Sequence, residues 1–334
     1  MQDNQKEKQK TNWLYILLLV LLILISALMI YMFLWAMMTS LKSNVDMIYG
    51  NPIGFPILDK ENPNNSYEQF FHFKNYADVF REIKISWSEI YYKGSTLVTH
   101  QTSTLFGWMY NFSSPFDYEK AYLPDMLVNT ILYAGVGGLI LAAVPALTAY
   151  LCSKFDFKVS RIVFTVYTVV MCIPIVGNFP SELTFLRDSG LYDSFFGIFL
   201  QKMSGGGMYF FIYYAFFGTL PDTYREAAEI DGASEWTIMW QIYLPLTGTM
   251  IATVFLLQFV ALWNDYQGVM LYLPTHPTLA YGVYELTTST TDEKLSNTPA
   301  QMTGCMMLAI PLIILFVLFK DKLMGNLSLG GLKE

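Results

Sequence analysis

The charged residues of one short stretch, Pro221 to Pro245, stand between two apolar segments. Five carboxylates and one guanidinium give this stretch a net charge of −4. Its apolar residues would lie along two short helices, and a hairpin of this length cannot bury them against itself. The chemistry that this pattern favours is docking into a groove of another molecule. We call the stretch the acidic hairpin; its charged residues are Asp222, Arg225, Glu226, Glu229, Asp231 and Glu235.

Local signals in the acidic hairpin predict two helices and the turn between them. Thr223 and Glu226 have the spacing of a capping box, which would begin the first helix. Gly232 supplies a position for positive φ, where a helix commonly ends. Ser234 is a suitable N-cap for the second helix. Pro245 is expected to stop that helix before the chain returns to apolar sequence.

Other chemical motifs do not occur in the sequence. It contains no Gly-x-x-x-x-Gly-Lys-Ser/Thr loop for nucleotide phosphates, no Ser/His/Asp set and no cysteine nucleophile motif. The spacing of its cysteines and histidines fits no metal site. We therefore expect no catalytic, metal-binding or cofactor-binding residues. The cysteines Cys152, Cys172 and Cys305 are interpreted as small buried hydrophobes.

Composition places the chain in a membrane. Hydrophobic residues make up 54% of the sequence and charged residues only 14%. The net charge of −7, with no basic patch, excludes a nucleic-acid-binding surface. Six apolar segments are long enough to be interpreted as membrane spans: Leu14 to Met38, Met126 to Cys152, Ile162 to Gly177, Phe195 to Leu220, Thr247 to Tyr266 and Gln301 to Phe319.

These spans predict an all-α polytopic membrane protein with both termini in the cytoplasm. Lysine and arginine gather on the inner side of the predicted topology, as the positive-inside rule requires. The first span could instead be a signal peptide, but its length favours a retained anchor. The predicted regions are a cytoplasmic tail (1–12), the first helix (13–38), an enlarged extracytoplasmic loop (39–125), a core of five helices (126–320) that includes the cytoplasmic acidic hairpin (221–245), and a cytoplasmic tail (321–334).

Polar residues inside the later spans are candidates for a translocation path, because an ionisable group in a span must face protein or water. Two readings stay open for Lys202: it lines the path, or it extends outward to the membrane surface. The triplet Gly205-Gly206-Gly207 predicts that its helix is broken or closely packed. The other polar residues could instead join helices by hydrogen bonds. The candidate path residues are Gln201, Lys202, Gln258, Asn264 and Asp265.

A family resemblance rests on the acidic hairpin. Glu226-Ala227-Ala228, Gly232 and Ile242-x-Leu244-Pro245 resemble the EAA loop of permease subunits in binding-protein-dependent ABC importers. Ile230 to Ser234 and Trp263 to Tyr266 are similar to the carbohydrate branch, the smaller maltose-type permease. The resemblance implies that the hairpin couples the chain to an ATPase. The implied coupling residues are Glu226, Ala227, Ala228, Asp231, Gly232, Leu244 and Pro245.

The same resemblance implies a complex in a bacterial inner membrane. Its other members would be a second, non-identical permease, two ATPase subunits that bind ATP and magnesium, and an extracytoplasmic solute-binding protein. The implied activity is import of a sugar, expected to be an oligosaccharide, by alternating access. A permease for a non-sugar solute is the first alternative. A polytopic membrane enzyme or sensor is the second.

The outer segments depart from the family pattern in one place. Phe73-Lys74-Asn75-Tyr76 resembles a family segment that normally leads into the second span, but here residues 81–122 intervene. The aromatic residues of this loop could stack on sugar rings, or they could pack on one another or at the lipid interface. Residues 267–299 form a further outer loop, which we expect to be solvated surface.

Overall fold

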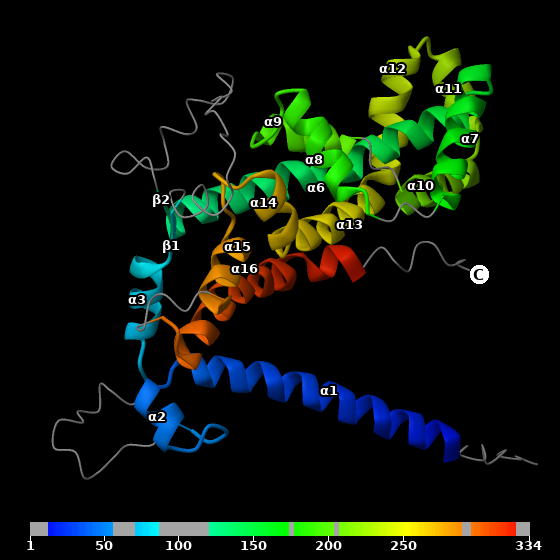
Figure 1. Cartoon of the computed structure of the whole chain (residues 1–334). Helices are drawn as coiled ribbons and strands as arrows, with labels where there is room; N and C mark the ends of the chain where they lie inside the picture. The colour runs from blue at the N-terminus through cyan, green and yellow to red at the C-terminus, as the bar shows by residue number, and fades with distance from the viewer. Residues whose placement is uncertain are drawn as a thin grey trace, which may run out of the picture. The chain divides into compact units, whose positions relative to one another are not determined.

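Helices form nearly all the secondary structure of the residues that the computed structural model describes, which are 13–55, 71–86, 120–173, 177–203, 207–288 and 295–324. Figure 1 shows the elements in chain order. The chain divides into two units. Unit 1 is Met1–Phe80 with Ser289–Met307, and unit 2 is Arg81–Thr288 with Leu308–Glu334.

Unit 1 is built on the long apolar helix α1 (Trp13–Ser40). The short helix α2 (Asn44–Tyr49) follows, then the start of α3 (Lys74–Glu82), and the start of α16 (Thr298–Met324). The last carbonyl groups of α1 have no partners within the helix. Asn75 Nδ2 donates to the carbonyls of Ser40 and Lys42 at 2.9 and 2.8 Å, and Thr303 Oγ1 donates to that of Ser40 at 3.1 Å. These bonds join α1 to α3 and α16.

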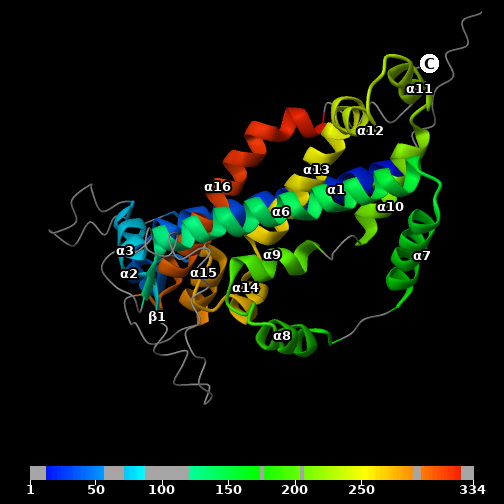
Figure 2. The same ribbon diagram turned by 90° about the horizontal axis from the view of Figure 1, so that it is seen from above.

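Unit 2 is built around α6 (Leu123–Lys154), against which α9, α10, α13 and α15 pack. The acidic hairpin lies at one end of α6, and the strands and α15 lie at the other end (Figures 1 and 2). The remaining elements are β1 (Lys84–Ser86), β2 (Lys120–Tyr122), α7 (Lys158–Cys172), α8 (Phe179–Asp188), α9 (Phe195–Met203), α10 (Gly207–Thr219), α11 (Thr223–Ile230), α12 (Glu235–Ile238), a π turn (Met239–Tyr243), α13 (Leu244–Trp263), α14 (Tyr266–Tyr272) and α15 (Leu279–Thr288).

Four described helices are long and apolar enough to cross a membrane: Tyr15–Ser40, Leu123–Lys154, Glu235–Trp263 and Thr298–Phe319. They contain the second and sixth predicted spans and most of the first and fifth. The third predicted span falls on α7, whose 15 residues would extend only about 22 Å at 1.5 Å per residue. The fourth falls on two helices, because α9 ends at Met203 and α10 begins at Gly207. Residues 204–206 between them lie outside the described residues, and Gly207 has a φ of +45°.

The inserted loop begins and ends at a two-stranded antiparallel ribbon. β1 pairs with β2 so that Lys84 lies opposite Tyr122 and Ser86 opposite Lys120. Ile85 and Ala121 are buried, and β1 packs against α15. Most of the loop's aromatic residues lie outside the described residues, so their predicted roles stay predictions. The ribbon brings the two ends of the insertion together beside α6.

The expectation that residues 267–299 are solvated surface is wrong for the part that is described. This region forms α14 and α15, and side chains such as Leu273 and Leu279 are fully buried. Two polar residues near the start of α6 secure it: Asn129 Nδ2 donates to the carbonyl of Pro277 at 3.1 Å, and Thr130 Oγ1 accepts from the N–H of Leu279 at 2.8 Å. The region is packed because its apolar residues have α6 to lie against.

Candidate functional site: the acidic hairpin and a polar cluster between helices

The turn of the acidic hairpin forms as its sequence predicts. Gly232 has a φ of +77°, and its N–H donates to the carbonyl of Glu229 at 3.0 Å. The N–H of Ala233 donates to the carbonyl of Ala228 at 2.9 Å, which completes the end of α11. The Ser234 hydroxyl accepts from the N–H of Thr237 and so caps α12. Glycine suits this position because most other residues are strained at this φ.

The predicted capping box of Thr223 and Glu226 is not formed. The helix α11 begins at Thr223, so Asp222 is its N-cap residue, and no side chain caps the first turn. The Asp222 carboxylate accepts instead from Lys154 Nζ at 2.8 Å. This hydrogen bond, together with the charge of the lysine, lowers the pKa of Asp222. The Asp222 carboxylate at the start of α11 thus binds a distant lysine instead of capping the helix.

The prediction that Pro245 stops the second helix is also wrong. α12, the π turn and α13 follow one another without a break, so the helix runs from Glu235 to Trp263. Proline has no N–H to donate, and its ring clashes with the carbonyl group one turn before it in an α-helix. A π turn lies just before Leu244 and Pro245, and the proline stands in the first turn of α13 after it. The hairpin is therefore continuous with a helix long enough to cross a membrane.

Two cations fix the hairpin to the end of α6. Arg225 donates to the carboxylates of Glu229 and Glu235 at 2.7 and 2.5 Å, and its guanidinium lies 5.0 Å from the ring centre of Phe155. Lys154 Nζ also donates to the carbonyl of Leu220 at 2.7 Å. Because Glu229 is on α11 and Glu235 is on α12, Arg225 fixes the angle between the two helices.

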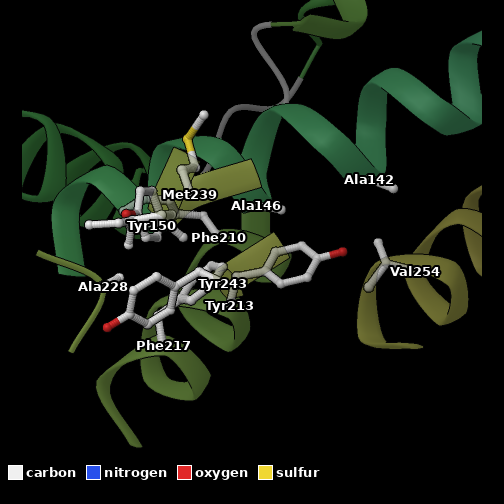
Figure 3. Packing of buried hydrophobic residues seen from close by; sticks show 12 residues of the cluster. Ala142, Ala146, Tyr150, Phe210, Tyr213, Phe217, Ala228, Met239, Tyr243 and Val254 are labelled. Atoms are coloured by element: carbon white, nitrogen blue, oxygen red, sulfur yellow. The ribbon is translucent and has the colours of Figure 1, made fainter. Parts of the chain in front are cut away.

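Part of the hairpin's apolar surface is buried within the chain itself. Ala228, Ile238 and Met239 pack with aromatic side chains of α6, α10 and the π turn. Figure 3 shows this cluster, which includes Tyr150, Phe217 and Tyr243. The sequence did predict helices with two unlike faces, but it assigned all these apolar residues to a partner. The buried ones pack on neighbours that a hairpin alone does not contain.

The opposite surface of the hairpin is exposed. Ile230 is 87% exposed and Trp236 is 70% exposed. Among the predicted coupling residues, Ala228 is buried and Leu244 is half-buried. Leu244 and Pro245 belong to the long helix rather than to the exposed turn. The exposed members are Glu226, Ala227, Asp231, Gly232 and Pro245.

Polar residues of the candidate path gather between helices of unit 2. The side chain of Lys202 lies inward against α6: a Cβ added at Gly137 would be 3.3 Å from Lys202 Cδ. Lys202 Nζ is 4.8 Å from the ring centre of Tyr133, and the Tyr133 hydroxyl donates to Asp265 Oδ2 at 2.7 Å. Asp265 also caps α14, because its Oδ1 accepts from the N–H of Gly268 at 2.8 Å. Lys202 and Asp265 thus share one contact partner.

A second carboxylate near Lys202 is that of Glu182, which was not among the candidate residues predicted from the sequence. It accepts from Gln201 Nε2 at 2.6 Å, from the Tyr272 hydroxyl at 2.8 Å and from Asn178. Its partners come from α9 and α14, and Glu182 itself is on α8. The one local signal was the spacing of Asn178 and Glu182 by four residues. We call Tyr133, Glu182, Gln201, Lys202, Asp265 and Tyr272 the polar cluster.

The other two path candidates are not part of the polar cluster. Asn264 is exposed and donates to the carbonyl of Val260 in its own helix at 2.9 Å. Gln258 is half-buried one and a half turns earlier on α13. Within the described ranges, no three histidine, cysteine or acidic side chains converge to hold a metal ion.

Residues 135–327 match the family described as "Binding-protein-dependent transport system inner membrane component". The chain is 27% identical over 229 residues to the melibiose/raffinose/stachyose import permease MelC of Bacillus subtilis (strain 168), covering 67% of this chain and 80% of MelC. It is 29% identical over 221 residues to a probable permease for starch degradation products, AmyC of Thermoanaerobacterium thermosulfurigenes, covering 64% and 77%.

A solved structure has the same fold. It is described as the crystal structure of a bacterial ABC transporter involved in the import of the acidic polysaccharide alginate, and one of its chains superposes with a TM-score of 0.65. At 21% identity, the match covers 92% of this chain and 95% of that chain. The family match takes in the acidic hairpin, all of α16 and every member of the polar cluster except Tyr133. This chain belongs to the binding-protein-dependent transport system inner membrane components, and it is a permease subunit of an ABC importer.

Proposed function

We propose that this permease subunit imports an oligosaccharide, and that the exposed surface of the acidic hairpin is where its ATPase docks. The names of MelC and AmyC support a sugar as the transported solute. The observation that carries the docking proposal is the two-sided packing of the hairpin. One side is fixed to α6 and α10 by Arg225, Lys154 and the aromatic cluster. The other side leaves Ile230 and Trp236 exposed.

The residues proposed to make the coupling contacts are those around the turn. Glu226 and Asp231 supply charge, while Ala227 and Gly232 allow close approach of a partner. Ala228 acts from inside, by holding α11 on the aromatic cluster. Leu244 and Pro245 begin α13. This helix would transmit a movement of the hairpin from the ATPase to the rest of the chain.

In the proposed topology, six spans place both termini and the acidic hairpin in the cytoplasm, with residues 39–125 outside. α7 and the pair α9 and α10 would supply the third and fourth spans. A second, non-identical permease, two ATPase subunits carrying ATP and magnesium, and a solute-binding protein would complete the importer. This chain itself needs no cofactor. Import would proceed by alternating access around a central path.

The path is proposed to pass the polar cluster. Lys202 and Asp265 are held between α6, α9 and α13, where their side chains can offer hydrogen bonds to sugar hydroxyls. Gln201, next to Lys202 in the chain, donates a hydrogen bond to Glu182. Gln258 and Asn264, on α13, would lie further along the same path.

Site-directed cross-linking tests the docking proposal. Cysteine is introduced at Asp231, which is exposed on the turn, and the membrane complex is treated with a short cross-linker. We expect a cross-linked product with the ATPase subunit. The yield of this product should fall when the ATPase is held in its ATP-bound state. A matched cysteine at Asp188, at the end of α8, should give no ATPase adduct. Equal labelling of Asp231 by a reagent that stays outside the cell would contradict both the docking and the topology.

The substrate is tested by uptake in proteoliposomes that contain the complete importer. Raffinose-type and maltodextrin-type oligosaccharides are offered as radiolabelled solutes, with a phosphorylated polyol and a peptide as competitors. Uptake of an oligosaccharide that neither competitor reduces is the expected result. Uptake of only the polyol or the peptide would assign the permease to a non-sugar solute and leave the docking proposal intact.

A further inference from the structure

Five large apolar side chains form an exposed surface just after α1. Among them, Tyr49 is 85% exposed and Phe55 is 74% exposed. Three are on α2, at positions one turn apart on a single side of the helix. The other two follow in the irregular segment after α2. We call this set the post-α1 apolar surface: Val45, Ile48, Tyr49, Ile53 and Phe55.

A hydrogen bond sets the position of this surface along α1. Trp35 Nε1 donates to the carbonyl of Pro52 at 3.0 Å. Trp35 lies five residues before Ser40, the last residue of α1, so this bond is about 7.5 Å inside the end of the helix at 1.5 Å per residue. The segment that carries Ile53 and Phe55 therefore turns back alongside the apolar helix instead of leading away from it.

Three backbone groups of this returning segment have side-chain partners. The side chain of Lys42 is almost fully buried, at 1% exposure, and its Nζ donates to the carbonyls of Asn51 and Pro52 at 2.8 and 3.3 Å. Asn51 Oδ1 accepts from the N–H of Ile53 at 3.0 Å. Ser43 caps the first turn of α2. Irregular backbone is stable at membrane depth only when its N–H and C=O groups have such partners.

We propose that residues 44–55 lie in the outer boundary of the lipid bilayer, with the post-α1 apolar surface inserted among the lipids. The surface follows the exposed apolar side chains of α1, such as Met29 and Ile30, and α1 is long and apolar enough to cross a membrane. Tyrosine and phenylalanine at such a depth match the amphipathic boundary between headgroups and acyl chains. The proposal rests on α1 spanning the membrane and not on the identity of the solute.

Depth measurement by spin labelling tests this. Cys152, Cys172 and Cys305 are replaced by alanine, and single cysteines are placed at Tyr49, Ile53 or Phe55. The complete importer is reconstituted in vesicles of phosphatidylethanolamine and phosphatidylglycerol. Collision with oxygen, which concentrates in lipid, is compared with collision with a water-soluble nickel chelate. Labels at Leu22, within α1, and at Asp156, whose side chain is 79% exposed in a polar turn, serve as the lipid and water references.

All three labels are expected to collide more with oxygen than with the nickel chelate, as the Leu22 label does. Labels that behave like Asp156 would overturn the proposal, because the surface would then lie in water. Labels protected from both reagents would also overturn it, since a protein partner would then cover the surface. ATP hydrolysis by each labelled complex checks that the importer has assembled.

A second variant tests the depth itself. Trp35→Phe keeps an aromatic ring but removes the N–H that holds Pro52. Labels at Ile53 and Phe55 should then shift toward the nickel chelate, while the Leu22 label is unchanged. Unchanged labels at both positions would show that this hydrogen bond does not hold the segment at the bilayer.

Discussion

The hydroxyl of Tyr133 donates a 2.7 Å hydrogen bond to the carboxylate of Asp265, and Lys202 Nζ lies 4.8 Å from the centre of the same tyrosine ring. A neutral tyrosine thereby separates a lysine from an aspartate inside a helix bundle. Asp265 uses its second carboxylate oxygen to accept from the N–H of Gly268 at 2.8 Å. The bond from Tyr133 joins α6 to the residue that begins α14.

Removing this bond should destabilise the protein. Tyr133→Phe leaves the Asp265 carboxylate without its tyrosine donor, and a hydrogen bond to a charged group contributes about 1.5–3 kcal/mol. The free energy of unfolding in detergent should fall by an amount of this order. Tyr213→Phe is the matched control, because the buried Tyr213 hydroxyl has no partner among the described residues. That variant should be neutral or more stable; an equal loss in both would show that the Tyr133 bond has no special weight.

The charge of Lys202 should matter for transport rather than for folding. Lys202→Met keeps a long apolar side chain against Gly137 but leaves the carboxylates of Asp265 and Glu182 without their nearby cation. We expect sugar uptake to fall at least about tenfold, a change of about 1.4 kcal/mol, with normal recovery of the ATPase on purification. Asn264→Ala, which removes only a bond within α13, should have a smaller effect. Normal uptake by both variants would remove these side chains from the path.

Two neighbouring residues of the hairpin should have different roles. Arg225→Gln breaks the contacts with Glu229 and Glu235 that join α11 to α12, so thermal stability should fall by about 1 kcal/mol, since the ion pairs are partly exposed. Glu226→Gln, at an exposed position, should leave stability unchanged and weaken retention of the ATPase. Thermal unfolding and co-purification measure the two effects. A stability loss in Glu226→Gln would show that this residue is structural.

Substitution of Gly232 can separate backbone strain from charge. Gly232→Asp should uncouple uptake from ATP hydrolysis while the chain still inserts, because it adds a negative charge to an acidic docking surface. Gly232→Asn is nearly the same shape and tolerates a φ of +77° as well. It should therefore retain most coupling. Gly232→Val, a branched residue at this φ, should disrupt the turn even though a Cβ there meets no atom within 4 Å. Normal uptake by Gly232→Asp would contradict the docking proposal.

Acid should loosen the hairpin through Asp222. The hydrogen bond from Lys154 lowers the pKa of this carboxyl in the folded chain below its unfolded value. The stabilisation is therefore present above the unfolded pKa and is lost as pH falls through the folded pKa. Because Asp222 is mostly exposed, the effect should be small. Hydrogen exchange of α11 between pH 5 and pH 3 should rise more in the native chain than in Asp222→Asn, which has already lost the charge.

The sequence predicted those features of the hairpin that depend on nearby residues. The positive φ of Gly232 and the cap at Ser234 follow from local backbone chemistry, and both are confirmed. α11 begins at Thr223, but the predicted capping box is absent, and the carboxylate of Asp222 before it binds Lys154, 68 residues away. The role of Pro245 was mispredicted because the helix continues past it, with a π turn just before Leu244. No residue type in the sequence predicts such a turn.

The polar cluster was predicted only in part for the same reason. Gln201, Lys202 and Asp265 stood out as polar residues in apolar segments. Glu182 did not, because its sequence neighbourhood resembles an ordinary polar connection, and its partner Tyr272 is 90 residues away. Packing of distant helices decides which of several polar residues meet, and one sequence does not contain that information.

The uninterrupted helix from Glu235 to Trp263 has a mechanical consequence. At 1.5 Å per residue, its 29 residues form a shaft about 43 Å long, with Trp236 near one end and Asp265 just beyond the other. No loop lies between them to absorb a tilt, and the π turn is the one place where the hydrogen-bond pattern changes along this described shaft. If the hairpin docks the ATPase as proposed, we expect a force on it to rotate this helix as one body about the π turn beside Pro245.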